Sequence, residues 1–158
     1  MPFTLNAPEE IDPVRGTASA GEERTMTVVV GGQQRIVDYT NLPTFNDPDG
    51  RTMRTLRMMG GTVVKIYIDP LLEAMRGSEG QFRDIVHDNA DAILAAVALL
   101  TEGYGSANPP QERCQDFTLT VDGPGGAKCD LQVSTCADKD PGGGVVATIE
   151  QASLGDCR

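Results

Sequence analysis

A nine-residue stretch in the middle of the chain constrains the fold most. Residues 92–100 read AILAAVALL, so the helix that they would form has no polar side chain on any face. A helix that is apolar all round has to be buried all round. In a chain of 158 residues a sheet can cover one side, and a second subunit is a candidate cover for the rest. The interface residues predicted on this helix are Ala92, Leu94, Ala95, Ala96 and Leu99.

This stretch is the second half of a longer predicted helix. Ser78 and Gln81 have the spacing of an N-terminal capping box, and Gly103 is placed to end the helix. A shorter helix is predicted at residues 70–76, with Asp69 as its N-cap. The apolar residues that recur along one stripe of the long helix are Phe82, Ile85, Val86, Ala90, Ile93, Val97 and Leu100.

Glycine-rich turns separate three pairs of strand-like segments. Two of the turns are Gly-Gly pairs, and the one at residues 31–32 lies between runs of β-branched residues, which is a strong signal for a β hairpin. The segment before the second, residues 51–59, has arginines at a period of three that suits neither face of a strand. The paired segments are 25–30 with 33–39, 51–59 with 62–68, and 117–121 with 129–133, and a last strand is predicted at 145–150. These elements predict an α+β fold in which antiparallel hairpins at both ends of the chain pack around one long central helix. The arrangement is either a sandwich or a partly open barrel with a helix.

The length of the chain corresponds to one domain of 16.8 kDa. Residues 1–24 mix proline, small and acidic residues without a period, as in a flexible or partner-binding arm. We therefore expect an N-terminal arm over residues 1–24 and a single α+β domain over residues 25–158.

Acidic residues outnumber basic ones by 23 to 13, which gives a net charge of −10 at pH 7. This charge opposes direct binding to nucleic acid and to anionic lipid, and no apolar run reaches the roughly 18 residues of a membrane-spanning helix. The expected partners are therefore copies of this chain or another protein. The first residues lack the apolar block of a secretory signal, so we expect synthesis in the cytoplasm, with incorporation into a particle as one later fate.

All four cysteines lie after residue 113, at Cys114, Cys129, Cys136 and Cys157, and none are spaced as C-x-x-C. Reduced and mostly buried thiols are the first expectation, with one or two disulfides or a metal-binding or reactive thiol as alternatives. If one strand runs unbroken from Cys129 to Cys136, the two side chains lie on opposite faces, about 23 Å apart at roughly 3.3 Å per residue. They could not then pair with each other, so any disulfide would use Cys114 or Cys157.

A cluster of polar residues is predicted on one face of the long helix. Asp84, His87, Asp88 and Asp91 are spaced by three, four or seven residues, which returns to the same side of a helix. His87 and Asp91 are one turn apart, a spacing that can hold a divalent metal or orient an imidazole. The alternative is a solvated helix face whose acids interact favourably with the helix dipole, and we favour it. No cofactor is expected.

Three arginines, Arg51, Arg54 and Arg57, form the one basic run. In so acidic a chain we expect them to pair with carboxylates, either its own or those of the next copy, with anion binding as the alternative. They are therefore candidate interface residues.

Three functions remain as hypotheses. The first is a non-enzymatic structural or assembly subunit that self-associates through β edges and an apolar helix. In architecture alone, strands around one helix with an acidic surface are similar to the ring-forming tube subunits of phage tails, which implies a virion or tail-tube-like component. The second is a small acidic binding or inhibitor protein for a basic partner. The third is a metal-dependent enzyme that uses Asp84, His87 and Asp91.

Overall fold

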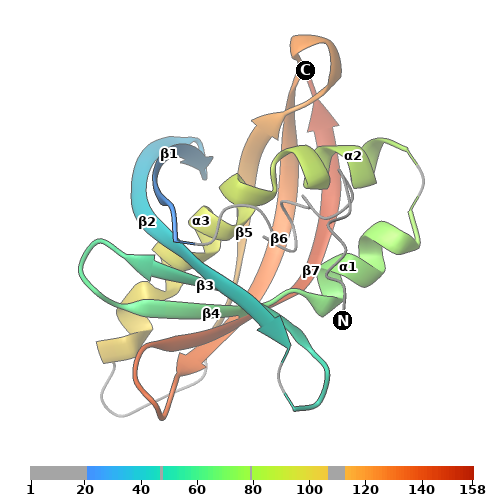
Figure 1. Cartoon of the computed structure of the whole chain (residues 1–158). Coiled ribbons are helices and arrows are strands. Elements are labelled where there is room, and N and C mark those ends of the chain that lie inside the picture. Colours follow the sequence, from blue (N-terminus) through green and yellow to red (C-terminus); the bar gives the residue numbers. More distant parts are fainter. Residues whose placement is uncertain (1–20, 47, 79, 107–112) are drawn as a thin grey trace, which may run out of the picture.

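A computed structural model describes residues 21–46, 48–78, 80–106 and 113–158. Seven strands form a closed barrel in the order β1-β2-β3-β4-β7-β6-β5 (Figure 1). All neighbours are antiparallel except β4 and β7, which are parallel. The strands are β1 Glu23–Val30, β2 Gln33–Asn46, β3 Thr52–Met58, β4 Val63–Tyr67, β5 Arg113–Asp122, β6 Lys128–Lys139 and β7 Val145–Cys157. The helices are α1 Asp69–Arg76, α2 Gln81–Asp88 and α3 Ala90–Thr101, with short 3-10 turns η2 Glu102–Ser106 and η3 Pro124–Gly126.

The α+β prediction with hairpins on both sides of a helical segment is confirmed, but the predicted arrangement of the strands is corrected. The strands form a closed barrel, and neither the sandwich nor the partly open barrel is found. The parallel pairing of β4 with β7 differs from the antiparallel prediction. It joins two strands about eighty residues apart in the chain, and such a distant contact leaves no local pattern in the sequence. The last strand is also longer than predicted, since β7 continues to Cys157.

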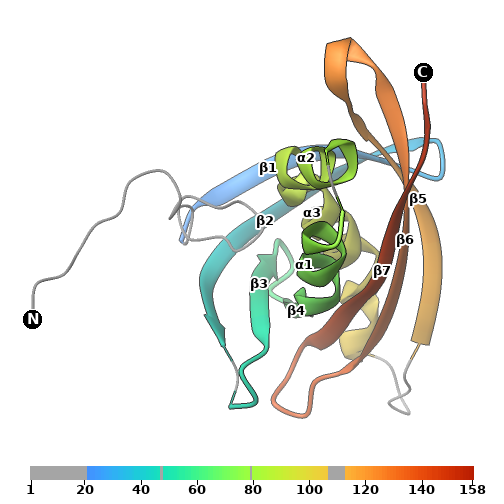
Figure 2. The ribbon, with the colours of Figure 1, turned by 90° about the vertical axis from the view of Figure 1, so that its right-hand side faces the viewer.

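The apolar helix lies inside its own barrel. Figure 2 shows the helices between strands β1–β4 on one side and β5–β7 on the other. α3 contacts β1, β2, β4, β5 and β7. Leu94, Ala95 and Ala96 are buried there, while Ala92 and Leu99 are partly buried. The cover that the sequence assigned to a second subunit is therefore supplied by strands of the same chain, and the buried face of α3 cannot serve as an interface between copies.

The predicted long helix is divided in two at Asn89, whose backbone leaves the helical region with φ −114° and ψ 21°. The predicted caps are wrong. Ser78 Oγ donates to the carbonyl of Ala74, and Gly80 precedes α2 without a side-chain cap. Asp69 is the first residue of α1, and its Oδ2 accepts a hydrogen bond of 2.9 Å from the backbone N–H of Thr52. The bond from Thr52 to Asp69 joins α1 to β3, a contact that helix spacing alone does not reveal.

All three predicted hairpins are confirmed. Gly31 and Gly32 both have positive φ, +58° and +81°, as a two-residue turn with the twist of its strands requires. β1 starts at Glu23, so the end of the predicted arm belongs to the barrel, and residues 1–20 lie outside the described residues. Another glycine, Gly144, allows β7 to start close to β4, since a Cβ there would stand 2.2 Å from the carbonyl oxygen of Val63.

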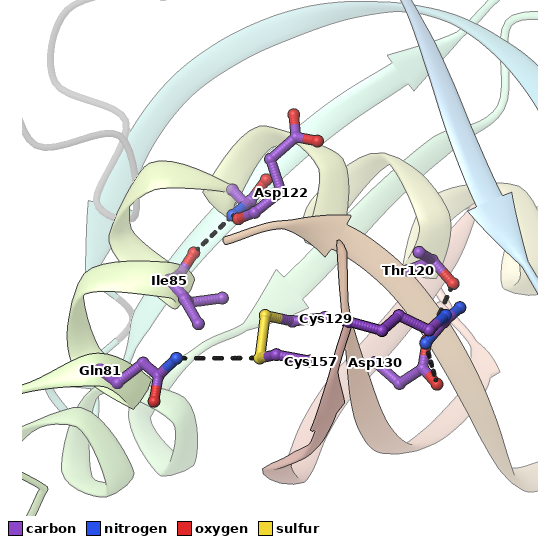
Figure 3. The surroundings of a disulfide bond; sticks show 9 residues. Gln81, Ile85, Thr120, Asp122, Cys129, Asp130 and Cys157 are labelled. Carbon is purple, nitrogen blue, oxygen red and sulfur yellow. Dashed lines mark hydrogen bonds and ion pairs between the residues drawn. A yellow bond between two sulfur atoms is a disulfide. The ribbon is translucent and has the colours of Figure 1, made fainter. Parts of the chain in front are cut away.

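The cysteines form two disulfides, Cys114–Cys136 and Cys129–Cys157, so the first expectation of reduced thiols is wrong. Cys129 and Cys136 do lie on opposite faces of β6, as their spacing predicted. Cys129 is buried in the barrel and Cys136 is on the outer side. Each disulfide joins two directly opposite residues of neighbouring strands. Figure 3 shows Cys129–Cys157, with the amide of Gln81 directed at Cys157.

Candidate functional site

Of the polar residues predicted to share one helix face, Asp84, His87 and Asp88 lie on α2, while Asp91 is separated from them. His87 Nδ1 lies 3.6 Å from Asp88 Oδ1, both side chains being exposed, while Asp84 is beside Arg83. Asp91 points elsewhere, because the helix breaks at Asn89, between His87 and Asp91. Within the described parts of the chain, no group of three or more His, Cys, Asp or Glu side chains could hold a metal ion.

Asp84 and Asp88 instead line a groove of about 690 Å³ between α2 and the turn that joins β5 to β6. Asp122, Gly123 and Pro124 form the opposite wall of this groove. All three carboxylates are exposed, and Asp122 is paired with Lys128. The groove is an acidic surface feature with no ligand geometry of its own.

The three arginines of the basic run have different surroundings. Arg51 lies 3.7 Å from Asp49 and stacks over Tyr67, with 4.2 Å between its guanidinium carbon and the ring centre. Arg57 is exposed and makes no ion pair among the residues that the structure describes. Arg54 is only 1% exposed, so it cannot contact a neighbouring copy. Arg51 and Arg54 therefore each lie near a carboxylate of the same chain, which is one of the two kinds of partner expected for them.

Arg54 belongs to a polar cluster at the edge of the barrel core. Its Nη2 donates a 3.0 Å hydrogen bond to Asn41 Oδ1 and lies 4.0 Å from Asp91 Oδ1. The other oxygen of Asp91 lies 3.5 Å from Arg24 Nη1 on β1. Asp91, at the start of α3, thus lies between the buried Arg54 of β3 and the partly exposed Arg24 of β1. This carboxylate connects the helix to both strands.

Tyr39 lies in the same cluster, and its environment favours the neutral phenol. Burial raises the pKa of Tyr39 from 10.0 to about 12, and the negative charge of Asp91 adds to this, although Arg24 and Arg54 act in the opposite direction. The Tyr39 phenol is therefore neutral at physiological pH. The contacts of this cluster join β1, β2, β3 and α3.

The barrel is closed by a short contact between β1 and β5. Among described residues, the two strands pair only at Val29 with Thr120 and at Val30 with Leu119. The turn adds one more hydrogen bond, in which the N–H of Gly31 donates to the carbonyl of Thr118. Along residues 23–28 β1 moves away from β5, and its edge on that side has no strand beside it within the described chain.

Antiparallel pairing shows which backbone groups this edge presents. Alternate residues of a strand direct their N–H and C=O groups to opposite neighbours. Since Val29 faces β5, the residues with the same orientation are Thr27, Thr25 and Glu23. All three are exposed. Three N–H groups and three C=O groups are thus available to an added strand.

The β5 side of the opening is closed by a side chain. The amide of Asn89 donates two 2.9 Å hydrogen bonds, to the carbonyl of Ile85 on α2 and to that of Asp122 at the end of β5. The opening itself is a groove of about 390 Å³, lined by residues of β1, β5 and the α2–α3 junction, including Met26, Asn89 and Asp91. Asn89 thus bonds to the end of β5 on one side of this groove, and the β1 edge lies on the other.

Reasoning from sequence did not find this site. The run of β-branched residues predicted β1 but not which of its sides would lack a neighbour. The one available signal was Asn89, a poor helix former within a predicted helix, because asparagine tends to bond to the backbone and interrupt helices.

Searches against protein-family models, curated proteins and solved structures find no match to this chain. None of the helices in the described segments is long and apolar enough to span a bilayer.

Proposed function

We propose that this chain is a non-enzymatic structural subunit that assembles with copies of itself by adding a strand at the β1 edge. The observation that carries the proposal is the edge along residues 23–28, which pairs with no other strand of the described chain and lies next to a two-residue contact with β5. Exposed strand edges are templates for pairing, and addition of a strand supplies backbone hydrogen bonds to an association. The enclosed apolar helix has no part in this proposal.

The surroundings of the edge support an ordered contact. Natural strand edges are often blocked by proline, by a bulge or by a covering loop. β1 has no proline, and its pairing with β2 is continuous from Glu23 to Val30. The ion pair between Arg24 and Asp91 also connects β1 to α3, which helps to keep the strand in place for pairing.

A single backbone group tests the proposal. Proline in place of Thr27 removes an N–H that points away from β2, so the β1–β2 ladder keeps its hydrogen bonds. We expect the wild-type chain to form oligomers by light scattering coupled to gel filtration, and Thr27→Pro to shift the protein toward monomer. Thr27→Val, which keeps the N–H and the β-branched shape, should assemble like the wild type. Circular dichroism checks that each variant is folded, and Glu23→Pro provides a second substitution of the same kind.

Two results would overturn the proposal: a wild-type chain that stays monomeric at every concentration, or oligomers that form equally well with Thr27→Pro and Glu23→Pro. A monomer that binds a basic protein, with affinity that falls as salt is added, would favour the acidic binding protein instead.

A further inference from the structure

We infer that the strand added at the β1 edge is β1 of a second copy, paired antiparallel about a two-fold axis that passes beside Thr25. This inference rests on the proposed function and specifies its partner and register. A two-fold contact uses the same surface on both copies, so β1 must be complementary to itself when one strand is reversed.

The number of hydrogen bonds favours one register. With Thr25 opposite Thr25 of the second copy, Glu23 lies opposite Thr27 and Thr27 opposite Glu23. All three outward residues of each strand then face outward residues of the other, which allows six backbone hydrogen bonds. Moving the axis to Met26 leaves only Thr25 and Thr27 paired, because the next outward residue, Val29, is already paired with β5.

The side chains favour the same register. An axis at Glu23 or at Arg24 would place two like charges directly opposite each other, which destabilises a strand pair. An axis at Thr25 places threonine opposite threonine and glutamate opposite threonine, which are compatible cross-strand pairs. The Thr25 hydroxyl is already fixed, since Oγ1 donates a 2.5 Å hydrogen bond to Asp38 Oδ1.

The extent of the free edge also fits a contact of this length. The edge ends at Val29, where β5 begins to pair, and Asn89 occupies the β5 side of the opening. Figure 2 shows β1 running from its turn beside β5 across the helices, so that its first residues lie well away from β5.

The net charge predicts how salt acts on this contact. Each copy carries a charge of −10, so two copies repel each other over long range. Added salt screens this repulsion while the backbone hydrogen bonds remain. Self-association should therefore strengthen as salt is added, in contrast to the binding of a basic partner.

Cross-linking with introduced cysteines tests the register. All four native cysteines are in disulfides, so an introduced thiol is the only free one. In the proposed dimer the two copies of residue 25 have Cα atoms about 5.5 Å apart. Two copies of residue 23 are four positions apart along the strand, about 13 Å at roughly 3.3 Å per residue. With a short bis-maleimide, Thr25→Cys should cross-link to itself in most molecules, and Glu23→Cys alone should not.

A mixture of Glu23→Cys with Thr27→Cys should cross-link between the two variants, because residue 23 lies opposite residue 27. Arg57→Cys, exposed on β3 two strands from the edge, is the control for random collision. The affinity of Thr25→Pro for itself should be weakened at least roughly tenfold, since two of the six hydrogen bonds are lost.

Each outcome is decisive. If Thr27→Pro weakens association but Glu23→Cys cross-links efficiently with itself, the two-fold register is overturned and the proposed function stands. The same conclusion follows if Thr27→Pro weakens association and Thr25→Cys does not cross-link. Association that is insensitive to Thr25→Pro and to Thr27→Pro would overturn both. Cross-linking of Thr25→Cys, together with the mixed pair and without Arg57→Cys, would establish the register.

Discussion

Two arginines of one strand show how strongly position decides what a residue does. Arg54 and Arg57 are three residues apart on β3, yet Arg54 is in the core, bonded to Asn41 and near Asp91, while Arg57 is exposed. Their identical chemistry makes them a matched pair for measuring the stability that the buried cluster provides.

We expect Arg54→Met to lower the free energy of unfolding by roughly 2–3 kcal/mol, because it removes the buried hydrogen bond to Asn41 Oδ1 and one cation from Asp91. The loss falls below that of a fully buried pair, because Asp91 is 22% exposed and keeps Arg24. Arg57→Met should change stability by less than about 0.5 kcal/mol. Urea denaturation of both variants checks this, and equal effects at the two positions would contradict the assigned role of the cluster.

At the scale of elements, the break between α2 and α3 lies at the groove between β1 and β5. Asn89 ends one helix, precedes the next and bonds to the end of β5, so one residue joins three elements. A continuous helix would keep Asp91 on the face of His87. The break instead turns Asp91 toward Arg24 and Arg54.

Asn89→Ala should cost about 1 kcal/mol, since the carbonyl of Asp122 loses its donor at a position where water can replace it. Amide hydrogen exchange should become faster near the end of β5 and stay unchanged in β3. The helix content should not rise, because burial inside the barrel and not propensity directs α3. Asp88→Ala, a change at an exposed neighbour without a bond to β5, is the control. Slower exchange in Asn89→Ala, or an equal change in Asp88→Ala, would show that the side chain of Asn89 does not stabilise the end of β5.

For the whole molecule, the two disulfides fasten β6 to both of its neighbours, one on each face of the strand. They close chain segments of similar length, with sequence separations of 22 and 28. Disulfides persist in oxidising surroundings, so the stability of this barrel depends on the redox state around it.

Replacing either pair of cysteines by alanine should lower the free energy of unfolding by roughly 3 kcal/mol, as closed loops of this length predict. The cost should be larger for the Cys129/Cys157 pair, because Cys129 is fully buried and its removal also leaves a small cavity. Denaturation of the two double variants, compared with the reduced wild-type chain, measures both effects. A change of less than 1 kcal/mol for both pairs would show that strand pairing alone holds β5, β6 and β7 together.

The sequence by itself determined the local structure of this protein. Gly31-Gly32 between β-branched runs specified a hairpin, and the apolar residues 92–100 specified a helix buried on every side, because turn geometry and side-chain periodicity depend only on neighbours in the chain. The opposite orientation of Cys129 and Cys136 followed for the same reason.

Only the tertiary structure decided what covers the helix, which cysteines pair, and which strand edge stays open. Each of these depends on a contact between residues far apart in the sequence: β7 beside β4, Cys157 opposite Cys129, and Val29 opposite Thr120. Asp84, His87 and Asp91 were predicted to lie together on the assumption of a continuous helix, but α2 and α3 separate at Asn89, whose side chain bonds to the distant Asp122. Barrel closure brings such residues together, and no local pattern encodes it.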